Sequence, residues 1–164
     1  MIVDHSSLPI FIDPSSKILI LGSFPSIKSR ELGFYYSHKQ NRFFLTLGRV
    51  FGEEAPLSIK DRKDFLKRHL IALYDVIERC EIVNSSDSSI KDVIPINIKK
   101  ILSDYPNIKK IGITGKKASS LFEKYLRQYV RDDIEVYYLP STSPANAKMS
   151  IEELVNEYKI LFVE

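Results

Sequence analysis

The stretch "KILILGSFPS" (residues 17–26) decides the fold class. Its first half is a short apolar run ending at Gly22, and its second half is polar and contains a proline. Short apolar runs rich in Ile and Val, bounded by turn residues, indicate buried strands. Three further runs of this type follow along the chain: "LIALYDVI" (70–77), "KKIGIT" (109–114) and "IEVYYL" (134–139).

Helical spacing fills the intervals between these runs. Pro95 and Ser150 stand where helix starts are expected, and Gly52 and Pro106 where helices end. The alternation of strands and helices predicts an α/β fold with a central four-stranded, mostly parallel sheet covered on both faces. The expected helices are 43–51, 61–70, 98–105, 118–129 and 151–162.

Composition limits the classes of protein that need considering. A chain of 164 residues suits one domain spanning 1–164. No apolar run approaches the roughly 20 residues needed to cross a membrane, and the first residues do not resemble a secretory signal. We therefore expect an intracellular protein without a membrane partner. Cys80 is the single cysteine and the three histidines are scattered, so we expect no disulfide, no metal and no cofactor.

Charge is distributed unevenly although the net charge is only +3. Residues 28–49 hold five basic side chains and one acid, interleaved with phenylalanines and tyrosines. Such a mixture suits contact with phosphates together with stacking on bases. The alternative is an amphipathic helix whose basic face is solvated.

The loops that leave the four strands should form the site, because ligands of parallel sheets bind beyond the carboxyl ends of the strands. These loops contain neither a G-x-S-x-G elbow nor the glycine spacing of a phosphate-binding loop. They offer amides, hydroxyls and aromatic rings instead. Such groups can stack on a flat ring, bind its edge and position a water. The candidates are Ser23, Phe24, Tyr36, Asn41, Ser141, Thr142, Ser143 and Asn146.

Two of these loops resemble known motifs. "GSFPSIKSRELGFYYSHKQNRFF" (22–44) is similar to the first motif of the uracil-DNA glycosylase superfamily, and "LPSTSPANA" (139–147) to the second. Together they most resemble the hypoxanthine-DNA (deoxyinosine) glycosylase branch. The resemblance implies a three-layer α/β/α domain that acts on damaged DNA as a monomer in the cytoplasm, associated with the nucleoid. It would flip out a deaminated base, hypoxanthine first, and hydrolyse its N-glycosidic bond. The alternatives are a uracil or mismatch glycosylase and an inactive nucleic-acid-binding module.

The resemblance also implies roles for single residues. Asn41 and Ser23 would be catalytic, with Asn41 orienting water or contacting the base. The base would lie against Phe24, Tyr36 and His38. Phe24 stands where the mismatch-specific branch has an Asn, which favours the hypoxanthine branch. The expected DNA-binding loop residues are Ser141, Thr142, Ser143, Asn146 and Lys148.

The residues themselves leave other roles open. Asn41 also suits a helix cap, and Tyr36 a packed core position. The hydroxyls of 141–143 also suit an ordinary turn bounded by prolines. Ala145 and Asn146 are poor wedges for the DNA stack, which leaves two alternatives: strand insertion is weak, or Met149 or Lys148 assists. No lysine is placed as a Schiff-base nucleophile. Weaker candidates for reading the base edge are Asp87 and Ser89, which also suit a solvated loop or helix cap.

Overall fold

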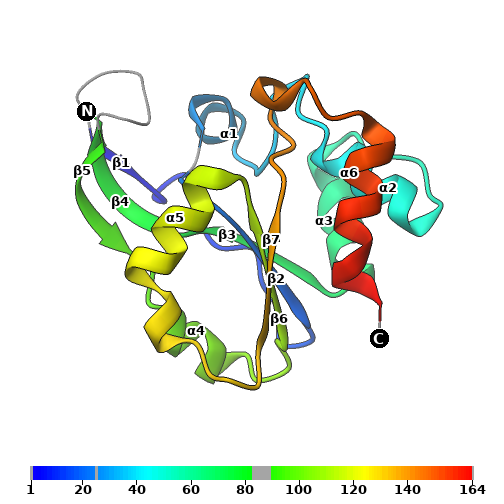
Figure 1. The fold of residues 1–164 in the computed structure, drawn as a ribbon. Helices are drawn as coiled ribbons and strands as arrows, with labels where there is room; N and C mark the ends of the chain where they lie inside the picture. The colour runs from blue at the N-terminus through cyan, green and yellow to red at the C-terminus, as the bar shows by residue number, and fades with distance from the viewer. Residues whose placement is uncertain (1, 25, 83–89, 164) are drawn as a thin grey trace.

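A parallel four-stranded sheet lies at the centre of the fold (Figure 1). The computed structural model describes residues 2–24, 26–82 and 90–163. The strand order is β3-β2-β6-β7, and each neighbouring pair is parallel. All four predicted strands are confirmed, each starting one residue later than expected: β2 (Ile18–Gly22), β3 (Ile71–Asp75), β6 (Lys110–Thr114) and β7 (Glu135–Leu139).

Helices cover both faces of this sheet. Successive side chains of a strand point to opposite faces, so alternate residues of β2 pack into two different cores. Leu19 and Leu21 pack into the core beneath α4 (Ile98–Asp104) and α5 (Lys116–Tyr125). Ile18 and Ile20 pack into the core on the opposite face. Figure 1 shows the resulting three layers, in which the second helical layer consists of α2 (Phe43–Phe51), α3 (Ile59–Arg68) and α6 (Ile151–Tyr158). The predicted α/β/α architecture is confirmed.

A second, antiparallel sheet was not predicted. It has the order β1-β4-β5 and consists of β1 (Ile2–Asp4), β4 (Ile77–Ile82) and β5 (Ile90–Pro95). The loop expected to leave the second predicted strand, at 78–92, therefore lies in strands at both of its ends. β4 follows β3 after Val76 alone, so the chain passes directly from one sheet into the other. The charges of β4 concealed it, since its exposed positions carry Glu78 and Arg79.

Capping side chains determine where two of the helices, α6 and α4, begin. Ser150 begins α6 with a capping box, in which its side chain and that of Glu153 exchange hydrogen bonds with backbone N–H groups. Pro95 was expected at a helix start, but it is the last residue of β5, and Asn97 caps α4 instead. Proline is compatible with the last position of this edge strand.

The remaining helices differ from the expectation in extent. A short helix, α1 (Ile27–Leu32), was not predicted. The segment expected as one helix at 118–129 divides into α5 and a 3₁₀ turn, η2 (Arg127–Tyr129). The last expected helix likewise ends as a 3₁₀ turn, η4 (Lys159–Phe162). Of the helices that the structure describes, none has the length and apolar character needed to cross a membrane.

Candidate active site

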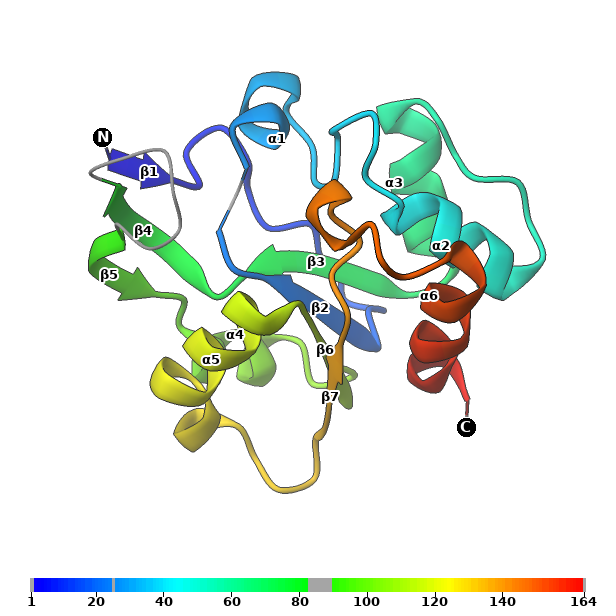
Figure 2. The same ribbon diagram turned by 45° about the horizontal axis from the view of Figure 1, so that its top comes forward.

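A pocket of about 1450 Å³ opens beyond the carboxyl ends of the parallel strands. In Figures 1 and 2, α1 and the orange segment containing the 3₁₀ turn η3 (Pro144–Asn146) both lie beyond this end of the sheet. Its volume exceeds the roughly 300–1,000 Å³ of a small-molecule site. All ten predicted site residues line it: Ser23, Phe24, Tyr36, His38, Asn41, Ser141, Thr142, Ser143, Asn146 and Lys148.

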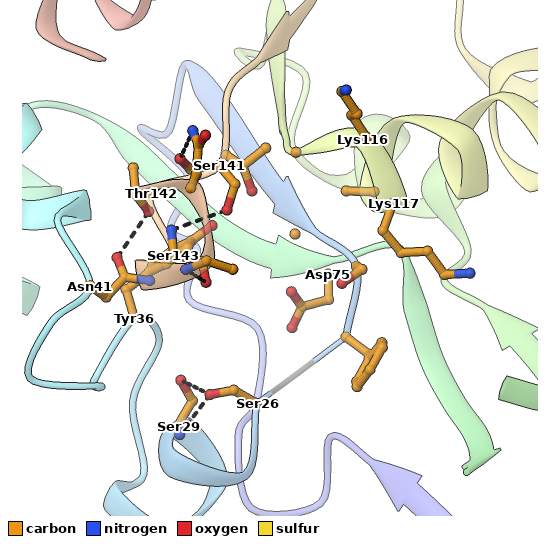
Figure 3. Close-up of a pocket in the computed structure, with 18 of the residues that line it drawn as sticks. Ser26, Ser29, Tyr36, Asn41, Asp75, Lys116, Lys117, Ser141, Thr142 and Ser143 are labelled. Atoms are coloured by element: carbon orange, nitrogen blue, oxygen red, sulfur yellow. Dashed lines mark hydrogen bonds between the residues drawn. The ribbon is translucent and has the colours of Figure 1, made fainter. Parts of the chain in front are cut away.

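Asn41 joins the two motif loops. Its Oδ1 accepts hydrogen bonds from the backbone N–H of Phe43 and from the Thr142 hydroxyl, both at 2.9 Å. Figure 3 shows the bond from Thr142. Because a backbone N–H can only donate, the contact with Phe43 fixes which end of the amide is oxygen. The Nδ2 group has no hydrogen-bond partner among the described residues. Asn41 therefore supports the start of α2 and also offers a donor in the pocket.

Arg42 also binds the second motif loop and Met149 just beyond it, through three backbone carbonyls. Its guanidinium donates to the backbone carbonyls of Met149 at 2.6 Å and Asn146 at 3.0 Å. Its own backbone N–H donates to the carbonyl of Thr142 at 3.0 Å. Three hydrogen bonds from one residue thus hold segments that are about 100 positions apart in the sequence. The sequence aligned Arg42 with the first motif but did not reveal this role.

The loop 141–146 is held in shape by its own side chains. The Ser141 and Ser143 hydroxyls accept from the N–H groups of Ser143 and Ala145, and Asn146 Nδ2 donates to the Ser141 carbonyl at 2.9 Å. Thr142 is 2% exposed, and its hydroxyl donates to Asn41, so it positions that residue. The loop is a turn built from hydroxyls, and it lines the pocket with Ser141 and Ser143.

Tyr36 lies on the pocket, with one ring face covered. Its ring stacks on Phe43, with centroids 3.8 Å apart and planes 9° apart. The neighbouring Tyr35 is buried instead, and its hydroxyl donates a hydrogen bond to the Pro9 carbonyl at 3.1 Å. Tyr36 has a φ of 56°, a left-handed conformation that is uncommon for a tyrosine. Such outliers persist where surrounding structure fixes them, often at functional sites.

The other predicted base-pocket residues have mixed surroundings. Phe24 packs partly against the core of β2 and α5 while it lines the pocket. His38 is exposed at the rim, where its Nδ1 accepts from the N–H of Gln40. The Ser23 carbonyl accepts from the N–H of Ile77, which ties the first motif to the β3–β4 junction. Asp87 and Ser89 lie outside the described residues.

Asp75 is a pocket residue that the sequence analysis missed. It ends β3 and is 5% exposed, and Figure 3 shows its carboxyl directed to the side of the pocket where Tyr36 lies. Its Oδ2 is 3.3 Å from Nε2 of His5. Burial raises the pKa of Asp75 to about 7 and lowers the pKa of His5. A carboxyl inside the apolar run "LIALYDVI" was the signal that could have revealed it.

Gly22 is required by this arrangement. A Cβ at this position would lie 2.6 Å from Asp75 Oδ1, closer than real contacts allow. The backbone partner of Gly22 across the sheet is Asp75 itself. The glycine that ends the apolar run therefore makes room for the buried carboxyl.

Positive charge dominates the rest of the lining. Two of the cations, Lys116 and Lys117, occupy the first turn of α5. The lining acids are Asp75 and Glu123. An excess of cations at a helix start and in the surrounding loops attracts polyanions. Within the described residues, no group of three or more His, Cys, Asp or Glu side chains could hold a metal ion. The lining cations are Lys28, Arg30, Lys116, Lys117 and Lys148.

Comparison with known proteins places this geometry in a family. The model of the uracil DNA glycosylase superfamily matches residues 9–161, which include both motif loops and the whole parallel sheet. The chain belongs to this superfamily. The two loops that Asn41 and Thr142 join, 22–44 and 139–147, are the segments that resemble the first and second motifs of this superfamily.

Individual relatives in the superfamily agree over most of the chain. A Methanosarcina barkeri protein named hypoxanthine DNA glycosylase is 37% identical, covering 85% of this chain and 87% of its own. A Methanosarcina acetivorans protein of the same name is 32% identical, covering 87% and 88%. A solution NMR structure of an M. acetivorans protein proposed to be a uracil DNA glycosylase superposes with a TM-score of 0.81. It is 29% identical, and the match covers 99% and 100% of the two chains.

Proposed function

We propose that the protein is a DNA glycosylase that flips hypoxanthine out of damaged DNA and hydrolyses its N-glycosidic bond. The observation that carries this proposal is the cationic pocket in which Asn41 joins the two motif loops and keeps its Nδ2 as a donor. The two relatives named hypoxanthine DNA glycosylase support hypoxanthine as the base.

Base flipping follows from the geometry of the substrate. The reacting sugar carbon and the base edge are inaccessible inside stacked DNA, so the nucleotide must leave the stack. The pocket offers Tyr36 and Phe24 as walls for an extruded flat base. Unstacking costs a few kcal/mol, and contact with aromatic rings of this kind offsets it.

Bond cleavage needs a positioned water and stabilisation of the departing base. The Asn41 amide is held by two accepted hydrogen bonds, so its Nδ2 is preorganised to donate to the base or to the water. The Ser23 side chain lies on the same pocket and would assist. The reaction breaks the bond between C1′ and the base nitrogen, and the water oxygen bonds to C1′.

DNA would be held through its phosphates. Lys116 and Lys117 at the start of α5, and Lys148 beyond the second loop, line the pocket. Hydroxyls of Ser141 and Ser143 would add hydrogen bonds to the strand. We expect one protein molecule to act per lesion, in the cytoplasm and associated with the nucleoid.

The test is excision from defined oligonucleotides in EDTA. Strands containing inosine, uracil or xanthine are incubated with the protein, and alkali then reveals abasic sites. We expect cleavage at inosine. Cleavage at uracil alone would reassign the base, as the relation to the proposed uracil glycosylase allows. Binding without any cleavage would refute the enzymatic proposal.

Asn41→Asp is the matched variant for the mechanism. It retains the oxygen that accepts from Phe43 and Thr142 but replaces the Nδ2 donor by a second acceptor. We expect a loss of excision on the order of 10²–10³-fold, as for other preorganised donors. Full activity in Asn41→Asp would contradict the role of Nδ2.

A further inference from the structure

The Asp75 carboxyl lines the pocket, but the water and phosphate contacts proposed above do not use it. Its Oδ2 is fully buried and accepts no hydrogen bond from the described residues. An ionised carboxylate in that position would lose its hydration without compensating donors. A protonated carboxyl avoids this cost. The geometry therefore favours the neutral acid.

The neighbouring His5 favours the same protonation state. Its Nδ1 lies 2.6 Å from the Leu8 carbonyl, which can only accept, so Nδ1 carries the hydrogen. Burial lowers the pKa of His5, which keeps the ring neutral and leaves a lone pair on Nε2. Asp75 Oδ2 lies 3.3 Å from this Nε2, and neither atom has a hydrogen-bond partner among the described residues. Two bare acceptors at this distance repel each other, which disfavours the ionised carboxylate, and burial raises the pKa of Asp75 to about 7.

The other titratable groups around the pair do not replace this acid. Tyr35 and Tyr36 approach from the segment before α2, and Tyr74 from β3 itself; burial raises the pKa of each phenol. Burial lowers the pKa of His5, and the negative charge of Glu78 in β4 partly opposes this by raising it. The remaining charged or histidine side chains on the pocket are Lys28, Arg30, His38, Lys116, Lys117, Glu123 and Lys148.

Resting on the proposed function, we propose that Asp75 is the general acid that protonates the departing purine, and that His5 positions it. The C1′–N9 bond breaks and its electron pair moves onto the base. The proton of the Asp75 carboxyl passes to a purine ring nitrogen, N7 or N3, so that hypoxanthine leaves as a neutral molecule. Water then bonds to C1′ and releases its proton to solvent, from which Asp75 regains one. One water is consumed, and no net proton is gained or lost.

The acid role gives the reaction a specific pH dependence. Only the protonated carboxyl can donate, so excision is full below the pKa of Asp75 and falls as pH rises through it. Asn41 and the serines carry no ionisation in this range. A descending limb that is present in the wild type and lost in Asp75→Asn therefore belongs to Asp75.

The experiment measures single-turnover excision of hypoxanthine from pH 5.5 to 9. We compare the wild type with Asp75→Asn and with Asp132→Asn, a control at an exposed position. We expect the wild-type rate to fall above about pH 7. At pH 6 the excision rate of Asp75→Asn should be lower than that of the wild type by on the order of 10²–10⁴-fold, as for loss of a general acid. Its pH profile should show no descending limb. Asp132→Asn should match the wild type.

The outcomes separate the two proposals. If Asp75→Asn retains the wild-type rate and the wild-type pH profile, the acid role is refuted while the glycosylase remains. If the wild type excises no base at all, the proposed function and the acid role both fail. His5→Gln tests positioning, because we expect it to shift the midpoint of the limb. An unshifted midpoint would refute that role for His5.

Discussion

Replacing Asp75 with Asn should make the protein more stable at neutral and alkaline pH. Burial raises the pKa of this carboxyl to about 7, from an ordinary value of 3.8. The folded state therefore holds the Asp75 proton more tightly than the unfolded state does. The stabilisation from this proton is complete below about pH 4 and is lost as pH rises to about 7.

The magnitude follows from the size of the shift. About three pKa units at 1.36 kcal/mol each give a cost on the order of 4 kcal/mol once Asp75 is ionised in the folded state. Asp75→Asn removes this titration and keeps nearly the same shape. His5 titrates in the opposite sense: its lowered pKa costs stability as pH falls below its usual range. Both proteins contain His5, so only the part of its titration that depends on Asp75 enters the difference.

The assay is urea unfolding of the wild type and Asp75→Asn at pH 4, 5, 6, 7 and 8. We expect the difference in free energy of unfolding to be smallest at pH 4, to grow in favour of the variant, and to level off above about pH 7. A difference that does not change with pH would refute the buried, proton-holding carboxyl. A stabilised variant that excises poorly would place Asp75 among site residues that trade stability for activity.

Three further predictions test the surroundings of the site. Thr142→Val removes the hydroxyl that holds Asn41 Oδ1 and should slow excision about tenfold with little change in DNA affinity, as single-turnover rates and filter binding would show; an unchanged rate would contradict the positioning role. Gly22→Ala should destabilise the fold by about 1–3 kcal/mol, measured by thermal unfolding, because its Cβ would meet Asp75. Lys117→Ala should weaken binding to inosine-containing and undamaged DNA equally and lower the salt slope by about one unit in fluorescence anisotropy; an unaltered slope would exclude a phosphate contact.

The parallel sheet could be predicted because each of its strands is mainly apolar, with charged residues only at strand ends. Strands covered on both faces carry that signal directly. β4 carries the opposite signal: its exposed positions hold Glu78 and Arg79, so the chain there read as a loop. Burial on one face alone gives a weaker pattern, which charged residues at a sheet surface obscure.

The site was predictable as a set of residues but not as a set of contacts. The motifs named the residues that the pocket gathers, yet the bond from Thr142 to Asn41 joins positions 101 residues apart. Nothing local in the sequence specifies such a pair. Asp75 was missed for a different reason. The apolar run around it predicts a strand, and the strand pattern alone does not show that the carboxyl at its end is buried in the pocket. Its pairing with His5 depends on the second sheet, which was also missed.

The most direct test of the central claim is release of free hypoxanthine from an inosine-containing oligonucleotide, followed by chromatography, for the wild type and Asn41→Asp. We predict that the wild type releases one hypoxanthine per lesion without added metal. Asn41→Asp should bind the same DNA and release the base on the order of 10²-fold more slowly. If the wild type binds the DNA but releases no base, the assignment of this pocket as a glycosylase site is contradicted.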